Sequence, residues 1–117
     1  MNTTLDLLKA LSDRNRLRVV VALMRVDELC ACQITELLQV TGATASRHMG
    51  ILIQAGLVRS RKDGRWVHYR LNGAAAPALL QWLEEDAKHS NDLKADRKLL
   101  KKIVACGPED LCRRQRG

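Results

Sequence analysis

Four cysteines have the most specific chemistry of any residues in this 117-residue chain: Cys30, Cys32, Cys106 and Cys112. Thiolates are the ligands that soft, thiophilic metal and metalloid ions select. One residue separates Cys30 from Cys32, and such a pair can close on one ion where the backbone is extended. On a regular helix it cannot, because two residues advance a helix by roughly 200°. Residues 27–32 lack a helical repeat, so we predict an irregular connection that carries a soft-ion site.

A second group of residues, at 41–48 and in the basic segment after it, suits contacts with DNA. Hydroxyl and guanidinium groups bind phosphates and the edges of guanine bases. From the first segment we predict DNA contacts by Thr41, Thr44, Ser46, Arg47 and His48. From the second we predict contacts with phosphates or the minor groove by Arg61, Lys62 and Arg65. His48 fits a packing or capping role equally well.

Two short helices and a hairpin are needed to position these groups. Apolar residues at helical spacing predict helices over 12–25, 33–40 and 43–55, with a break at Thr41 and Gly42. Two helices joined by a tight turn are typical of a helix-turn-helix, whose second helix enters the major groove. Residues 57–61 and 66–71 read as strands on either side of Asp63-Gly64, a strong hairpin signal. The predicted fold class is mainly α with a two-stranded β-hairpin, a winged helix-turn-helix.

The residue pattern after position 73 predicts how two copies of the chain associate. A loose apolar stripe with a 3.5-residue period predicts one long helix over 74–105. That helix is longer than the small core needs, so we expect a homodimer through the terminal helices. A short basic tail follows at 106–117. We expect residues 1–117 to form a single domain, with the DNA-binding core and wing at 12–71.

Charge and composition restrict the partners. Twenty Lys and Arg against thirteen Asp and Glu give a net charge of +7, which favours polyanions. Aromatic residues make up 3% and Phe is absent, so double-stranded DNA ranks above single strands that need stacking platforms. The sequence has no apolar run of about 18 residues and no secretion signal, which predicts a cytoplasmic protein with reduced thiols and no membrane partner. It also lacks Gly-rich phosphate loops, nucleophile elbows and metalloprotease motifs, so we expect no enzyme.

Residues 11–71 resemble the ArsR/SmtB family of metal-responsive repressors. The resemblance lies in Leu11-Ser12-Asp13 with Arg16-Leu17, in Ser46-Arg47-His48-Met49, in Ala55-Gly56-Leu57-Val58, and in Gly64-Arg65-Trp66-Val67-His68-Tyr69-Arg70-Leu71. It implies a dimeric repressor that a metal releases from operator DNA.

The segment Glu28-Leu29-Cys30-Ala31-Cys32 looks like the sensing motif of arsenic-responsive members, which hold trivalent arsenic or antimony through three thiolates. The resemblance implies one of these ions as inducer and no organic cofactor. Thr35 occupies the third cysteine position, so the third ligand stays open among Cys106, Cys112, a small-molecule thiol and water. Cys106 and Cys112 could equally form a separate site in the tail, or bind nothing.

Two other functions fit parts of the pattern. A thiol redox regulator of the same fold would oxidise a cysteine pair, although a disulfide between Cys30 and Cys32 would be strained. A non-specific architectural DNA-binding protein would also be small and basic, but it needs no cysteine motif. Release of DNA by peroxide without a response to arsenite would indicate the redox regulator. Competition by unrelated DNA would indicate the architectural protein.

Overall fold

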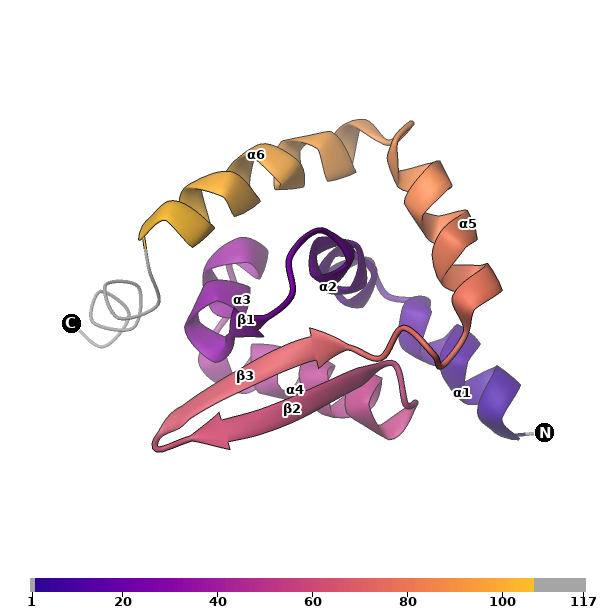
Figure 1. Ribbon diagram of the computed structural model, residues 1–117, viewed down its shortest axis with the longest axis horizontal. Coiled ribbons are helices and arrows are strands. Elements are labelled where there is room, and N and C mark those ends of the chain that lie inside the picture. The colour runs from indigo at the N-terminus through magenta and orange to yellow at the C-terminus, as the bar shows by residue number, and fades with distance from the viewer. Residues whose placement is uncertain (1, 107–117) are drawn as a thin grey trace.

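The computed structural model describes residues 2–106, which form a winged helix-turn-helix (Figure 1). In chain order the elements are α1 (Asn2–Leu11), α2 (Arg14–Arg25), β1 (Leu29–Cys30), α3 (Ala31–Leu38), α4 (Gly42–Gln54), β2 (Val58–Asp63), β3 (Trp66–Leu71), α5 (Pro77–Ala87) and α6 (Asn91–Cys106). The strands form one antiparallel sheet in the order β1-β3-β2. The predicted fold class is therefore confirmed, with one strand more than expected.

Local signals account for the ends of the DNA-binding helices. The side chain of Asp13 caps α2 by accepting hydrogen bonds from the backbone N–H groups of Asn15 and Arg16 at 2.9 and 3.1 Å. Thr41 caps α4, and its hydroxyl accepts from the N–H of Thr44 at 3.2 Å. Helix α3 ends where Gln39 adopts a left-handed conformation, with φ of 56°. Gln39 and Thr41 together fix the turn between α3 and α4.

The wing is a regular hairpin. Residues from Val58 to Asp63 on β2 pair with residues from Leu71 to Trp66 on β3. Gly64 closes the turn with φ of +63°, a conformation that L side chains rarely adopt, as the Asp-Gly pair predicted. The additional strand β1 pairs Leu29 with Tyr69 and Cys30 with His68. The segment that we expected to be a simple connection is thus attached to the wing.

The expectation of one long helix over 74–105 is wrong, because the chain turns at residues 88–90 and continues as α6. Ser90 starts the new helix by accepting a hydrogen bond from the N–H of Leu93 at 3.3 Å. Helix α6 then folds back across α2 and α3 (Figure 1). Its apolar residues Leu100 and Ile103 are buried in the chain's own core. They are therefore not available to pack against a second copy.

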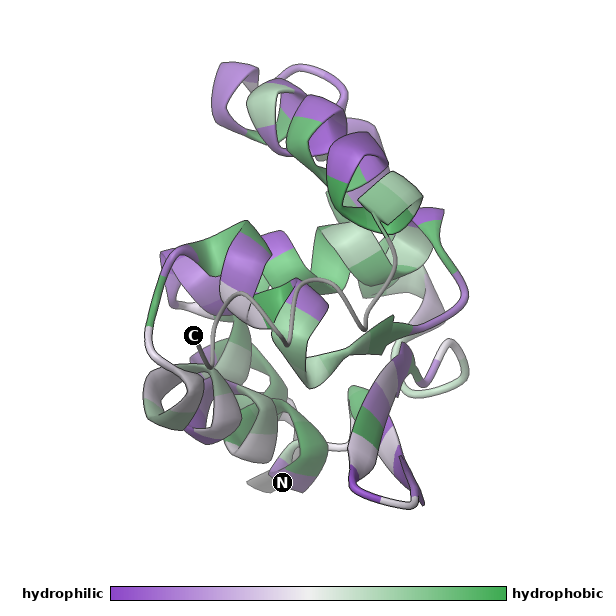
Figure 2. Ribbon diagram, turned by 90° about the vertical axis from the view of Figure 1, so that its left-hand side faces the viewer, coloured by the Kyte–Doolittle hydropathy of each residue, from purple (hydrophilic) through white to green (hydrophobic). Residues whose placement is uncertain are grey.

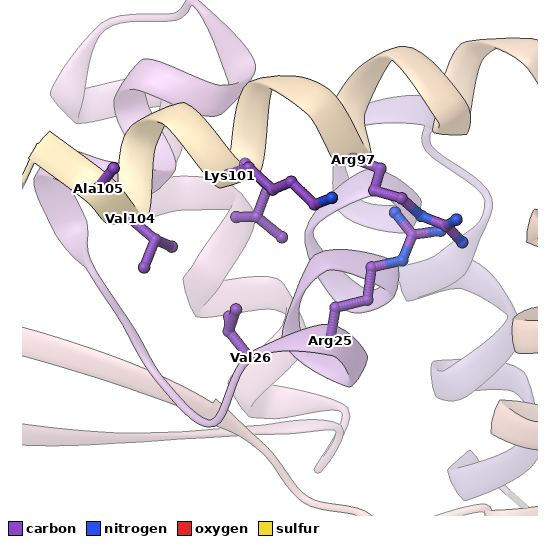
Figure 3. Close-up of a pocket in the computed structure, with 7 residues that line it drawn as sticks. Arg25, Val26, Arg97, Lys101, Val104 and Ala105 are labelled. Carbon is purple, nitrogen blue, oxygen red and sulfur yellow. The ribbon is translucent and has the colours of Figure 1, made fainter.

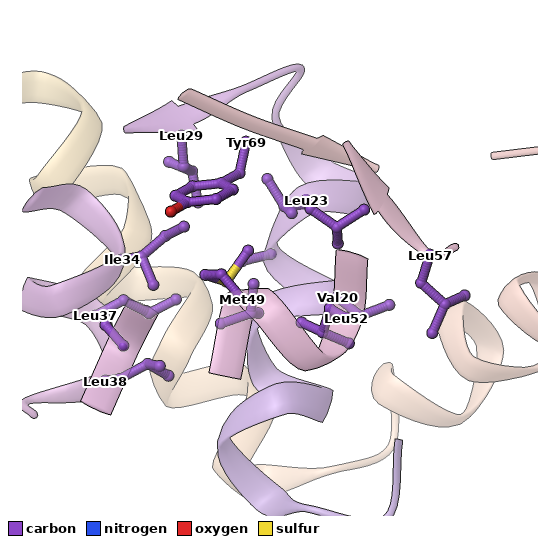
Figure 4. Packing of buried hydrophobic residues seen from close by; sticks show 14 of the residues in the cluster. Val20, Leu23, Leu29, Ile34, Leu37, Leu38, Met49, Leu52, Leu57 and Tyr69 are labelled. Atoms are coloured by element: carbon purple, nitrogen blue, oxygen red, sulfur yellow. The ribbon is translucent and has the colours of Figure 1, made fainter. Parts of the chain in front are cut away.

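The core lies between the helix-turn-helix, the sheet and α6. Figure 4 shows Val20 and Leu23 of α2, Ile34 and Leu37 of α3, Met49 and Leu52 of α4, and Tyr69 of β3 meeting at its centre. Without Phe, this core is built mainly from branched aliphatic side chains. Figure 2 shows hydrophilic residues at the hairpin turn and on the outer side of α6. The basic residues of the wing are exposed to solvent.

One ion pair fastens α6 to the helix-turn-helix. Arg18 of α2 donates from Nε and Nη2 to the two carboxylate oxygens of Asp96 at 2.8 and 2.9 Å. The same Nη2 also donates to the backbone carbonyl of Leu37 in α3 at 2.9 Å. The hydrogen bond to Asp96 raises the pKa of Arg18. Because both side chains are mostly buried, this pair holds three helices together.

Candidate DNA interface and cysteine segment

The outer face of α4 carries most of the predicted DNA contacts of the second helix. Thr41, Ser46 and Arg47 are exposed, and Thr44 is half-buried. The hydroxyl of Thr41 donates to that of Thr44 at 3.0 Å, which fixes both at the start of the helix. Hydroxyl groups at a helix N-terminus together with an exposed guanidinium form a surface suited to phosphates and base edges.

His48 does not share this face, so we withdraw it from the predicted DNA contacts. It is 6% exposed, and its Nδ1 lies 3.2 Å from Nη1 of Arg16 and 3.9 Å from Oδ1 of Asp13. The reason is helical spacing, because positions 45, 48, 49 and 52 follow the i, i+3, i+4, i+7 pattern of the buried side. His48 is a packing residue that joins α4 to the start of α2.

The wing presents the second group of predicted contacts. Arg61, Lys62 and Arg65 are all exposed, and Arg59 and Arg70 add further positive charge. Because residues two apart on a strand share a face, Arg59 and Arg61 project from one side of β2. The structure therefore brings α4 and a basic hairpin together on one molecule, in the arrangement that a winged helix uses for DNA.

Arg61 has a partner that sequence reasoning missed. Its Nε and Nη2 donate to the two carboxylate oxygens of Glu28 at 2.8 and 2.7 Å. Nδ1 of His68 lies 3.7 Å from the same carboxylate. The hydrogen bond from Arg61 lowers the pKa of Glu28, and the same bond raises the pKa of Arg61. Glu28, two residues before Cys30, thus ties the cysteine segment to the wing.

The two cysteines of the predicted ion site lie in different backbone conformations. Cys30 ends β1 and caps α3 with extended backbone angles, and its side chain is 1% exposed. Its N–H donates to the side-chain oxygen of Gln33 at 2.8 Å. Cys32 is half-buried in the first turn of α3, because that helix begins at Ala31 rather than at residue 33 as expected. The segment is therefore half strand and half helix.

The described residues add no third side chain that completes a metal site beside this pair. Within residues 2–106 there is no group of three or more His, Cys, Asp or Glu that could hold a metal ion. Thr35, at the third motif position, donates its hydroxyl hydrogen bond to the carbonyl of Ala31 at 2.9 Å. Cys106 is an exposed free thiol at the end of α6, and Cys112 lies outside the described residues.

No helix in the described part of the chain is long and apolar enough to span a membrane.

Comparisons with known proteins agree with this geometry. Residues 13–60 match the family model described as bacterial regulatory protein, arsR family. The chain is 41% identical over 68 residues to the arsenical resistance operon repressor of Escherichia coli, which covers 58% of each protein. It is 36% identical over 85 residues to the arsenic resistance transcriptional regulator ArsR2 of Pseudomonas putida, covering 73% of this chain and 70% of that one.

A solved structure gives the same fold. HlyU from Vibrio cholerae superposes with a TM-score of 0.65 at 27% identity, covering 72% of this chain and 90% of HlyU. The match to the E. coli repressor spans less than two thirds of that protein's length. The match to the P. putida regulator is longer and includes most of both chains.

Proposed function

Because this chain belongs to the ArsR family of bacterial regulatory proteins, we propose that it is a homodimeric repressor released from operator DNA when trivalent arsenic or antimony binds Cys30 and Cys32. The observation that carries the proposal is the position of Cys30. This residue is paired with β3 of the wing and also caps α3, which packs on α4. An ion bound there acts on both parts of the DNA interface.

Ion binding changes the first turn of α3. The backbone is extended at Cys30, whereas Cys32 lies in the first turn of α3. Two residues advance a helix by roughly 200°, so both sulfurs reach one ion only when the turn around Ala31 unwinds. Unwinding also breaks the hydrogen bond between the Thr35 hydroxyl and the Ala31 carbonyl. The remaining ligand comes from Cys106, Cys112, a small-molecule thiol or water.

Two routes carry this change to DNA. Through α3, the unwound turn alters how α4 is supported, and thereby the position of Ser46 and Arg47. Through β1, it shifts Glu28 and its partner Arg61 on the wing. Dimeric helix-turn-helix proteins need their two reading helices one DNA turn apart, so a small reorientation is enough to weaken binding. Linkage requires DNA to weaken ion binding by the same factor.

We assign the dimer contact to α1 together with α5, which is the first part of the segment 74–105 that the sequence predicted for this role. Leu5 and Leu8 of α1 are 51% and 52% exposed, and Trp82 of α5 is 61% exposed. A shallow groove of about 360 Å³ runs between these helices beside Leu8, Pro77 and Leu79. Large apolar side chains on two adjacent helices are typical of a surface that a second copy covers.

The test is fluorescence anisotropy on DNA from upstream of the protein's own gene, with arsenite, antimonite, cadmium and zinc as titrants. The protein is kept reduced with a phosphine, because dithiol reductants bind arsenite themselves. We expect arsenite or antimonite to release the DNA, and the double variant C30S/C32S to stay bound. The variant Ala31→Ser is the matched control, since it alters the same turn and keeps both thiols.

Each outcome separates the parts of the proposal. Release of the double variant by arsenite would exclude Cys30 and Cys32 as the site. Tight DNA binding that no ion changes would leave a family repressor with a different signal, and release by peroxide alone would indicate a redox regulator. In the C106S variant, a weakened arsenite response with unchanged DNA affinity would identify Cys106 as the third ligand.

A further inference from the structure

A pocket lies between the end of α2 and the last turns of α6 (Figure 3). Its volume is about 500 Å³, within the range of small-molecule sites. The lining residues fall into a cationic group and an apolar group: Arg25, Arg97 and Lys101, and Val26, Leu100, Val104 and Ala105. Neither the proposed ion site nor the DNA interface uses them.

The cationic group is placed where like charges repel. Figure 3 shows the guanidinium groups of Arg25 and Arg97 side by side at one end of the pocket. Burial, and next the charge of Arg97, lower the pKa of Arg25. In the described part of the chain, no carboxylate lies within 4.0 Å of either guanidinium or of the Lys101 ammonium. Arg25 instead donates a long hydrogen bond to the carbonyl of Leu93 at 3.4 Å. An anion at this end would remove the repulsion.

The apolar group forms the rest of the wall. Val26 follows α2, and Leu100, Val104 and Ala105 come from α6. Val104 is 47% exposed although it is large and apolar, so it has surface to offer to a ligand. A ligand that fits both ends carries one negative group and an aliphatic body. Two guanidiniums can hold a carboxylate through paired, charge-assisted hydrogen bonds.

We propose that this pocket binds an amphiphilic carboxylate, with its headgroup between Arg25 and Arg97 and its aliphatic chain along Val26 and Val104. Lys101 adds a third positive charge beside the headgroup. The ligand bridges α2 and α6 and contacts Val26, four residues before Cys30. It therefore fastens α6 against the segment that leads into β1.

The test uses decanoate as probe and the full-length, reduced protein. Isothermal calorimetry gives the affinity, and backbone amide NMR shifts locate the bound probe. We expect decanoate to bind and to shift the amides of residues 25–26 and 97–105. Decanol has the same chain without the charge, and acetate has the charge without the chain, so both should bind at least about tenfold more weakly.

A pair of variants on one helix assigns the headgroup contact. Arg97→Gln should weaken decanoate binding by about tenfold or more, because it removes a charge-assisted hydrogen bond. Lys98→Gln is the matched control, since Lys98 is exposed on α6 but does not line the pocket. The proposal is overturned if decanoate does not bind, if decanol binds as tightly, if R97Q and K98Q behave alike, or if the shifts lie at α1 and α5 instead. Unchanged thermal unfolding of both variants excludes misfolding as the cause.

Discussion

Replacing Glu28 by Gln should increase both the affinity for DNA and its dependence on salt. In the free protein, the Glu28 carboxylate accepts two hydrogen bonds from Arg61, at 2.8 and 2.7 Å. A phosphate must therefore compete with Glu28 for that guanidinium. The pair is exposed, with 54% of the Arg61 side chain accessible, so solvent screens it and its loss should change stability little. The effect on DNA binding is larger.

The magnitude follows from counterion release. Each phosphate that a protein neutralises contributes about −0.9 to the slope of log affinity against log salt. One freed arginine per subunit gives two contacts in a dimer, so the slope should become more negative by about 1.8. Anisotropy titrations of operator DNA at several salt concentrations measure this slope. Between 0.1 and 0.3 M salt, E28Q should lose roughly sevenfold more affinity than the unchanged protein does.

Two further variants make the result decisive. Asp63→Asn removes the same negative charge from the wing, but Asp63 makes no hydrogen bond to Arg61 within the described residues, so its slope should stay close to that of the unchanged protein. Adding Arg61→Gln to E28Q should restore the original slope. The reasoning is refuted if R61Q weakens the salt dependence of DNA binding as much in the otherwise unchanged protein as it does in E28Q. Arg61 would then already bind phosphate despite Glu28.

Three other predictions concern stability and assembly. Asp96→Asn should lower the unfolding free energy by about 2–3 kcal/mol in urea melts, because it breaks the mostly buried pair with Arg18. Asp92→Asn loses an exposed contact with Arg14 and should cost less than about 0.5 kcal/mol, so equal losses would contradict the prediction. The pKa of the Asp13 carboxyl is lowered overall. Burial raises it, but hydrogen bonds from the N–H groups of Arg16 and Asn15, with the charges of Arg16 and His48, lower it by more. A lowered pKa adds stability above the ordinary value of 3.8 that is lost as the pH falls through the folded value; Asp13→Asn, which keeps a capping oxygen, should therefore show a smaller drop between pH 5 and pH 2.5, and an equal drop would exclude Asp13 as the cause. Leu8→Glu should yield monomers in analytical ultracentrifugation and weaken operator binding, while Ile53→Glu on α4 should remain dimeric; a dimeric L8E would move the contact away from α1.

The helix-turn-helix and the wing could be predicted because their signals are local. Asp63-Gly64 specifies its turn through a positive φ at glycine, and Thr41 specifies the start of α4 through its hydroxyl. For His48 the sequence left DNA contact and packing equally open, because a polar side chain at a buried position gives no warning of its partners. Those partners, Arg16 and Asp13, lie more than 30 residues earlier in the chain.

The features that sequence reasoning missed depend on contacts between distant residues. β1 has only two residues, so it shows no alternation, and it is a strand only because β3 lies beside it. The apolar stripe of 74–105 resumes at Leu93 after the polar residues 88–90, and periodicity does not tell whether the stripe covers its own core or another molecule. Arg18 and Asp96 are 78 residues apart, and Glu28 and Arg61 are 33 apart. Only the folded chain brings these pairs together.

The attachment of α6 also bears on the order in which the molecule opens. This helix joins the rest of the described chain through one apolar face, the mostly buried Arg18–Asp96 pair and two longer polar contacts at its start, those of Asp92 with Arg14 and of the Leu93 carbonyl with Arg25. Such a unit can separate while the helices beneath it keep their own packing. Native-state hydrogen exchange should then show amides of α6 exchanging at a lower opening free energy than those of α2 and α4. Each such opening uncovers the outer side of α3, so the rate at which α6 lifts sets how often solutes reach the helix that Cys30 caps.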